Sequence, residues 1–325
     1  MPPSCGDWLS VLQRHLRPPL FKPEGTERLR RLARGLPGDL LTVLELRLGN
    51  SGGPIDLAFR LTGPEEALRI ADVLPASQAR RFLSAWAEPD TALSSIHSAW
   101  VEFDLDRELR EVPSPVVCAK LTSDAPLPWL TGTLFPAMHG KPLTPAQERI
   151  VRLCHESLPS SAYVLYAFSL LSRGADTLRL EIFGLSPTTI LAYLDRVAPT
   201  AVSWVKGPAA LFQGVERVHL SLDIGEEILP RIGIEGSFSR LPNWEPGWRK
   251  LFGRLIDQGL CRPEERDAAL AWRGSDTFWT APAAWPVEAI GPVGFCFRKL
   301  SHVKVVCRPD RRLEAKLYLM LGYLP

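Results

Sequence analysis

The chain has 325 residues, of which 46% are hydrophobic, and this content is enough to bury one large core or two smaller ones. Its formal net charge is +2, and it carries no long block of Lys and Arg. Composition and charge therefore give no reason to expect a nucleic-acid partner.

Targeting and redox signals point to an ordinary intracellular protein. The N-terminus (Met1, Pro2, Pro3) lacks the charged-then-apolar layout of a signal peptide, and no apolar run reaches the ~18 residues of a membrane span. The six cysteines are scattered, with no C-x-x-C pair and no His at metal-ligand spacing from a Cys. We therefore expect a reduced, cytoplasmic protein with no membrane partner, no bound metal and no cofactor.

Five times along the chain, a pair of strand-like runs is followed by a helix-like stretch. One supersecondary unit repeated in this way indicates a single architecture, so we expect residues 1–325 to form one domain. No repeat is identical to another at the residue level, and only the pattern recurs. The paired runs are Leu41–Leu48 with Ile55–Leu61, Ala99–Leu105 with Val116–Thr122, Tyr163–Leu171 with Thr177–Phe183, Arg217–Ile224 with Arg231–Phe238, and His302–Cys307 with Ala315–Leu321.

Helix-start signals separate these hairpins. Several predicted helices open with Pro in the first turn or with a capping box, and each has one apolar stripe to bury. The last two lie in a helical insert, about residues 244–298, before the final hairpin. The predicted helices open at Thr26, Pro64, Ala76, Thr144, Ser186, Pro246 and Pro263.

The strands alternate between apolar and polar residues, which means that each has one buried face and one polar face. In the first strand, for example, Leu44 and Leu46 alternate with Glu45 and Arg47. The amphipathic helices need apolar surface to cover, so they take the leucine faces. The polar faces then point either to solvent, from an open layered α+β fold, or inward, in a closed barrel.

Ten strands must close or leave long unpaired edges. We therefore favour an α+β fold in which a ten-stranded antiparallel β-barrel of five hairpins is ringed by helices. A barrel of this size has a lumen wide enough for a ligand. The cations that alternation places inside are Arg47, Arg60, Lys120, Arg179, Lys304, Arg308 and Lys316, and the acids are Glu45, Asp56, Glu102, Asp104, Glu181 and Glu235.

This architecture resembles the ABBA (PT-barrel) prenyltransferases, which include bacterial aromatic, fungal indole and cyanobactin peptide enzymes. The indole enzymes carry an acid on the first strand and an Arg on the second, where this chain has Glu45 and Arg60. Their second hairpin often reads Phe-Asp-Leu followed by a Lys-bearing strand, as Phe103-Asp104-Leu105 and Lys120 do here. Their Lys-x-Tyr strands are matched by Lys316-Leu317-Tyr318. The resemblance covers roughly residues 26–325.

Two features depart from the family pattern. The third hairpin of the family usually offers Arg-x-Lys, but this chain has Arg179-Leu180-Glu181, with an acid where a cation is expected. The inward cations and acids are also nearly balanced in number, whereas a diphosphate site should be clearly positive. Each charged residue could therefore serve only to neutralise another across the lumen, because an unpaired buried charge is costly.

The resemblance implies that an allylic donor loses diphosphate and that a nucleophile captures the carbocation. Cations already in place stabilise the leaving diphosphate, a tyrosine ring shields the carbocation, and a carboxylate orients the acceptor or takes its proton. The implied diphosphate ligands are Arg60, Lys120, Arg179, Lys304 and Lys316, with Tyr318 as the shield and Glu45 as the catalytic carboxylate. The residues that we expect to contact the acceptor are Trp100, Glu102, Asp104 and Glu181.

The sequence has no D-D-x-x-D run to hold magnesium diphosphate, so a metal-independent reaction is expected. The inward acids would also suit a cationic acceptor such as an arginine guanidinium or a basic peptide, which fits peptide modification (RiPP chemistry) in secondary metabolism. The alternative is a non-catalytic barrel that binds a peptide or small molecule in a biosynthetic pathway. Clustered cations beside an aromatic wall would favour the enzyme, and cation–acid pairs throughout the lumen would favour the binding protein.

Overall fold

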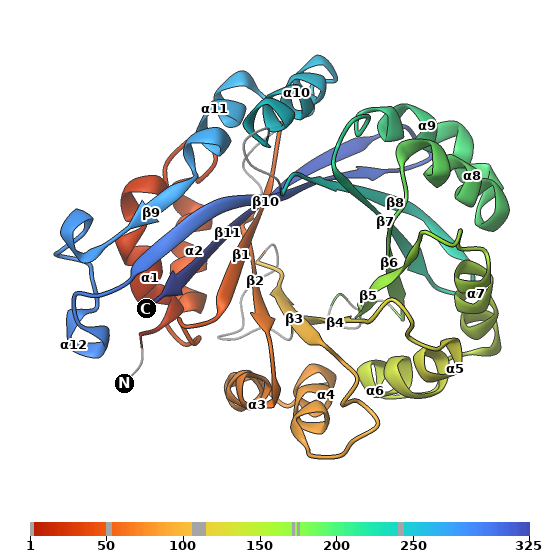
Figure 1. Cartoon of the computed structure of the whole chain (residues 1–325), viewed down its shortest axis with the longest axis horizontal. Coiled ribbons are helices and arrows are strands. Elements are labelled where there is room, and N and C mark those ends of the chain that lie inside the picture. The colour runs from red at the N-terminus through yellow and green to blue at the C-terminus, as the bar shows by residue number, and fades with distance from the viewer. Residues whose placement is uncertain (1–2, 50–53, 106–114, 171–172, 174–175, 240–243) are drawn as a thin grey trace.

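The computed structural model describes residues 3–49, 54–105, 115–170, 173, 176–239 and 244–325. In this part of the chain, ten antiparallel strands form a closed barrel (Figure 1). The sheet closes because the last strand pairs with both its hairpin partner and the first strand. The barrel strands are β1 (Leu41–Arg47), β2 (Asp56–Leu61), β3 (Ser98–Phe103), β4 (Val116–Lys120), β5 (Tyr163–Ser169), β6 (Leu178–Phe183), β7 (Arg217–Ile224), β8 (Ile228–Ser237), β10 (Phe295–Cys307) and β11 (Leu313–Leu324).

Helices surround the barrel, so the predicted closed α+β architecture is confirmed and the open layered alternative is wrong (Figure 1). Short turns join some of them, namely Gln13–His15, the π-helical Leu130–Leu134, Pro199–Ala201 and Phe278–Thr280. The helices are α1 (Cys5–Val11), α2 (Pro23–Ala33), α3 (Pro64–Val73), α4 (Gln78–Ala87), α5 (Leu127–Trp129), α6 (Phe135–His139), α7 (Pro145–Glu156), α8 (Pro187–Val197), α9 (Val202–Ala210), α10 (Trp244–Asp257), α11 (Pro263–Ala271) and α12 (Val287–Ile290).

The hydrophobic core lies between the barrel and the helices. Leu44, Leu57 and Phe59 from the apolar strand faces are fully buried in one continuous core, together with Tyr193 of α8. Burying each such side chain stabilises the fold by about 1.5–3 kcal/mol. Because these faces turn outward, the polar strand faces are left to line the lumen.

The start of the last hairpin differs from the prediction. Strand β10 begins at Phe295 rather than His302, so the helical insert ends before residue 298. An additional short strand, β9 (Gly274–Asp276), pairs with Cys296–Arg298. The register shifts between Leu300 and His302, and this irregularity breaks the alternation that marks a strand in the sequence.

The first helix of the prediction also begins elsewhere. Helix α2 starts at Pro23, and Thr26 lies inside it, where its hydroxyl donates a hydrogen bond to the Lys22 carbonyl. A proline suits the first helical position, so Pro23 rather than Thr26 marks the start. The earlier helix α1 has no predicted counterpart and is opened by a capping box between Ser4 and Asp7.

The predicted strand that runs to Leu171 ends at Ser169, and Leu171 lies outside the described residues. Among the helices of the described ranges, none combines the length and apolar character needed to cross a bilayer.

Candidate functional site

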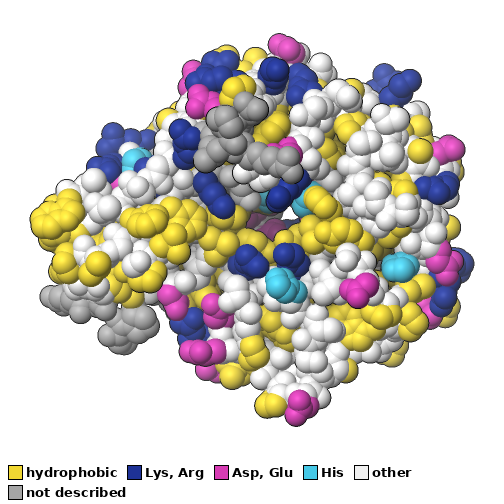
Figure 2. Space-filling model, in the orientation of Figure 1, with side chains coloured by type: hydrophobic (Ala, Val, Ile, Leu, Met, Phe, Trp, Pro, Cys, Tyr) yellow, Lys and Arg dark blue, Asp and Glu magenta, His cyan; other side chains and the backbone are white. Residues whose placement is uncertain are grey.

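The predicted site residues lie on the strand faces opposite the helix-covered core, around a central hollow. Figure 2 shows this hollow near the middle of the molecule, with Lys and Arg, Asp and Glu, and His side chains beside it. Strand register decides which of these charges meet, because residues paired across neighbouring strands point to the same face.

Lys316 and Tyr318 of β11 both bind Glu45 of β1. The Lys316 ammonium lies 2.5 Å from Glu45 Oε1, and the Tyr318 hydroxyl donates to Oε2 at 2.5 Å. Burial alone would raise the pKa of Glu45, but Lys316 and Arg47 hold it well below its usual range. Glu45 is therefore ionised with both oxygens bonded, which suits the first of its two predicted roles, orienting the acceptor, better than the second, taking its proton.

Lys304 of β10 is also bonded to a buried acid. Its ammonium lies 2.5 Å from Glu235 Oε1 and 3.1 Å from the Ser221 hydroxyl. Burial would raise the pKa of Glu235, but Lys304 and the nearby His302 lower it to about 2. Lys304 is therefore neutralised, although we predicted it as a diphosphate ligand.

Arg179 of β6 binds Asp223, an acid that we did not predict to lie in the lumen. Its Nε and Nη2 atoms lie 2.5 and 3.1 Å from the two carboxylate oxygens of Asp223, and Arg231 shares Oδ2 at 3.0 Å. The guanidinium also lies over the Phe168 ring, 5.6 Å from its centroid. Alternation along β7 puts Asp223 on the same face as Ser221, so the signal for it was present.

Arg60 of β2 and Lys120 of β4 differ from the three cations described above. Within the described ranges neither has a carboxylate in hydrogen-bond or ion-pair contact, and both are partly exposed. Burial and the charge of Arg60 lower the pKa of Lys120. Strand β3 lies between them, and its Trp100 pairs with Arg60 while Lys120 pairs with Tyr166. We call these four residues the Arg60–Lys120 patch.

Two of the predicted acceptor contacts, Glu102 and Asp104, are bound by Arg173. Arg173 Nη2 lies 2.5 Å from Glu102 Oε1, and Nε and Nη2 each lie 2.7 Å from one oxygen of Asp104. Arg173 stands between β5 and β6, outside any periodic pattern, so no sequence signal marked it as a lumen residue.

Two histidines on the lumen face, His219 and His302, also take part. His219 Nδ1 lies 2.5 Å from Glu181 Oε1, and Glu181 is the third predicted acceptor contact. The His302 ring stacks on Tyr318 with 3.9 Å between centroids and an interplanar angle of 18°. One face of Tyr318 is therefore covered, which limits the predicted carbocation shield to the other face.

Two clusters of possible metal ligands lie on the lumen face. The ligand atoms of Glu45, Asp56 and Glu102 lie within 4.8 Å of one another, and so do those of Glu181, His219 and Glu235. In each cluster a lysine ammonium already lies 2.5 Å from a carboxylate, Lys316 in the first and Lys304 in the second. A metal ion would have to compete with that ammonium.

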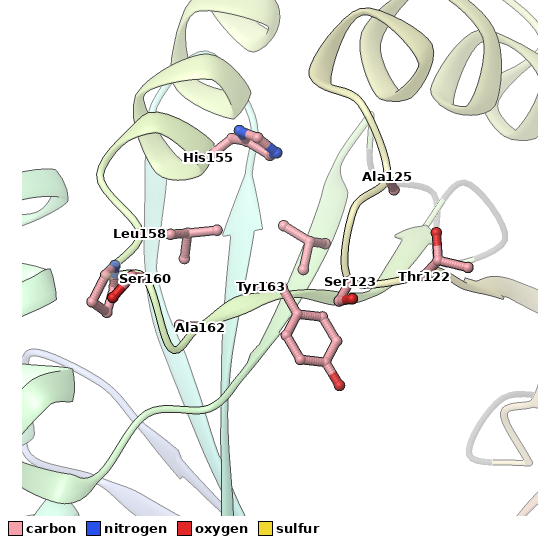
Figure 3. Close-up of a pocket in the computed structure, with 10 residues that line it drawn as sticks. Thr122, Ser123, Ala125, His155, Leu158, Ser160, Ala162 and Tyr163 are labelled. Carbon is pink, nitrogen blue, oxygen red and sulfur yellow. The ribbon is translucent and has the colours of Figure 1, made fainter.

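A pocket of about 220 Å³ lies away from these charges (Figure 3). It is formed where α7 ends and β5 begins, with His155, Leu158 and Tyr163 among its lining residues. The described residues that line it include no Lys, Arg, Asp or Glu, so it does not suit a diphosphate.

No protein-family model and no curated protein sequence matches the chain. Solved structures do match it over nearly its full length. AnaPT from Neosartorya fischeri has a TM-score of 0.59 at 10% identity, covering 97% of this chain and 91% of its own. The prenyltransferase PriB in its apo form has a TM-score of 0.56 at 12% identity, covering 97% and 94%. The chain has the PT-barrel fold.

A third PT barrel has a ligand-bound structure. The 6-dimethylallyltryptophan synthase from Micromonospora olivasterospora, in complex with DMASPP and Trp, has a TM-score of 0.52 at 12% identity and covers 97% of this chain and 95% of its own. In the present PT barrel the predicted diphosphate ligands fall into two groups. Arg179, Lys304 and Lys316 are paired with buried acids, and Arg60 and Lys120 are not.

Proposed function

We propose that the protein is a prenyltransferase that moves an allylic prenyl group from a diphosphate donor to an aromatic or peptide acceptor without a metal ion. The observation that carries this proposal is the Arg60–Lys120 patch, where two cations without an acid partner in the described chain stand beside Trp100 and Tyr166. We further propose that residues 1–325 act as one domain and that the protein is cytoplasmic. The solved PT barrel bound to DMASPP and Trp supports the donor class.

The patch has the charge that the reaction needs. The C–O bond of the donor breaks with both electrons going to the diphosphate, so negative charge grows on the leaving group. A cation ~4 Å away at a partly dry site contributes up to ~4 kcal/mol. Arg60 and Lys120 would bind the leaving group, and the Trp100 and Tyr166 rings would shield the allylic cation.

Acids on the two strands that flank the Arg60–Lys120 patch, β1 and β6, suit the acceptor. Glu45 is kept ionised by Lys316, so it can accept a hydrogen bond from an N–H or O–H group of the acceptor and orient it. Glu181, bonded to His219, is a second such group. The proton released after bond formation would leave through one of these carboxylates or through solvent in the lumen.

The test is calorimetric titration with dimethylallyl thiolodiphosphate, a donor analogue that resists cleavage, first without metal and then with magnesium. We expect micromolar binding without metal. Arg60→Ala and Lys120→Ala should each weaken it at least about tenfold, which corresponds to about 1.4 kcal/mol.

Lys206→Ala is the matched control, because Lys206 is exposed on α9 and far from the lumen face, and it should bind the analogue as the unmodified protein does. Unchanged affinity in both patch variants would refute the assignment of the donor site. Binding that appears only with magnesium would refute metal independence.

A second candidate is a non-catalytic barrel that binds a peptide or small molecule. The observation that favours it is the pairing of Arg179, Lys304 and Lys316 with buried carboxylates, which removes most of the predicted positive charge. This candidate predicts that the donor analogue does not bind under either condition and that peptide ligands do.

A further inference from the structure

Arg173 holds two acids on the lumen face with the full width of its guanidinium. Its Nε and Nη2 atoms contact both oxygens of Asp104 at 2.7 Å, and Nη2 also contacts Glu102 at 2.5 Å. All three side chains are partly buried, with 22%, 17% and 17% of Arg173, Glu102 and Asp104 exposed. A planar fork that spans two oxygens is the geometry in which a carboxylate recognises guanidinium rather than ammonium.

The neighbouring Asp56 has one carboxylate oxygen that is ion-paired but can still accept a hydrogen bond. Asp56 is fully buried, and its Oδ2 atom receives no hydrogen bond. Arg47 Nη1 approaches Oδ2 to 2.6 Å but donates to the Pro54 carbonyl at 3.0 Å, so the contact is an ion pair without hydrogen-bond geometry. A buried carboxylate oxygen without a donor is costly, and a ligand with N–H groups would satisfy it.

Three acids on this wall lie close together. Glu45, Asp56 and Glu102 have carboxylate oxygens within 4.8 Å of one another. Burial and the charge of Glu45 raise the pKa of Asp56 well above its usual range, and burial and neighbouring acids raise that of Glu102 although Arg173 opposes the shift. These shifts mean that the wall stabilises added positive charge.

We propose that Glu102, Asp104 and Asp56 form a subsite for the guanidinium group of an arginine-containing peptide acceptor, and that Arg173 fills it when no acceptor is bound. That the ligand is the prenyl acceptor rests on the proposed function. That the subsite binds a guanidinium group does not. Five N–H donors in one plane can serve two carboxylates at once, which an ammonium group cannot do in the same geometry.

Chemical rescue tests the subsite without any knowledge of the donor. Arg173→Ala would leave Glu102 and Asp104 without their cation and lower the melting temperature. Ethylguanidinium at millimolar concentration should restore it, and should bind this variant at least about tenfold more tightly than ethylammonium does. The unmodified protein should bind ethylguanidinium at least about tenfold more weakly than the variant, because Arg173 occupies the site.

Arg231→Ala is the matched control, since Arg179 still holds Asp223 after that change and no rescue is expected. If Arg173→Ala does not fold, Arg173→Gln keeps a neutral side chain of similar length for the same measurement. Adding Glu102→Gln and Asp104→Asn to either variant should abolish rescue.

Equal rescue by ethylammonium, or no rescue of a folded Arg173 variant, would overturn the proposal. With rescue established, Nα-acetylarginine amide should bind the variant as ethylguanidinium does, and failure of that probe alone would reject the arginine ligand. None of these measurements uses the diphosphate donor, so their failure is distinct from failure of the donor-binding test.

Discussion

Lys316 and Glu45 form a buried pair in which neither partner tolerates loss of the other. Lys316→Ala would leave the buried Glu45 charge uncompensated, so we expect a loss of about 3–5 kcal/mol in the free energy of unfolding. Urea denaturation at pH 7 measures it. Combining this change with Glu45→Gln should recover most of the loss, because no bare charge then remains.

Lys120→Ala serves as the comparison for this pair, since Lys120 has no acid partner in the described part of the chain and its removal should change stability by less than about 1 kcal/mol. If Lys316→Ala proved as stable as Lys120→Ala, the buried pair would not have the importance that its geometry indicates.

Asp56 makes stability depend on pH in the opposite direction from Glu45. Its folded-state pKa is raised, so its contribution is fully present below the unfolded pKa of about 3.9 and is lost as the pH rises toward the folded pKa. Between these two pKa values, the free energy of unfolding falls by about 1.4 kcal/mol per pH unit relative to a variant with a residue that does not titrate. Asp56→Asn should therefore gain stability over the unmodified protein as the pH rises from about 4 toward the folded-state pKa of Asp56, as measured by denaturant unfolding. A difference that is constant over this range would show that Asp56 titrates normally.

Sequence alternation could place single charged residues in the lumen but could not pair them. Lys304 and Glu235 are separated by 69 positions, and Arg179 and Asp223 by 44. Their meeting depends on the register between strands, which no local pattern encodes. Arg173 was beyond prediction for a different reason, because it comes from the connection between β5 and β6 and has no strand periodicity.

At the scale of elements, Gly236 lets strand β8 pack closely against Phe212, which follows α9. A Cβ atom at Gly236 would lie 2.5 Å from the ring of Phe212, which is fully buried and has no room to move. Gly236→Ala should therefore cost about 1–3 kcal/mol through overpacking, as measured by thermal unfolding.

Gly253→Ala is the control for this change, because Gly253 lies within α10 and a Cβ atom there meets nothing within 4 Å. It should stabilise the protein by about 0.5–1 kcal/mol, since alanine is the better helix former. A destabilised Gly253→Ala together with a neutral Gly236→Ala would contradict the packing described for Gly236.

The elements that the sequence predicted well are those with strong local signals. Helices α3, α7 and α8 open with the predicted Pro in the first turn. The predicted start of β10 was wrong. Its first residues pair with β9 and the strand then passes through a register shift, so the apolar–polar alternation changes phase before His302.

At the scale of the whole molecule, closure of the barrel followed from the number of strands. Ten strands with one apolar face each could not be left open without long edges, and β11 removes both edges by pairing with β10 and β1 (Figure 1). The fold was therefore accessible from periodicity and count alone. The near balance of cations and acids in the lumen could also be predicted from the sequence. Which acids bind Lys304, Lys316 and Arg179 could not, because this depends on the strand register.

This pairing has a consequence for any charged ligand. A ligand that enters the lumen finds Arg179, Lys304 and Lys316 already held by acids, so it binds to any of them by displacing an internal partner. The binding free energy is then the difference between the ligand's contact and the internal ion pair that it replaces, rather than the full strength of the new contact. Such a lumen behaves as an ion exchanger, and it discriminates among ligands by whether they can substitute for the side chain that they release.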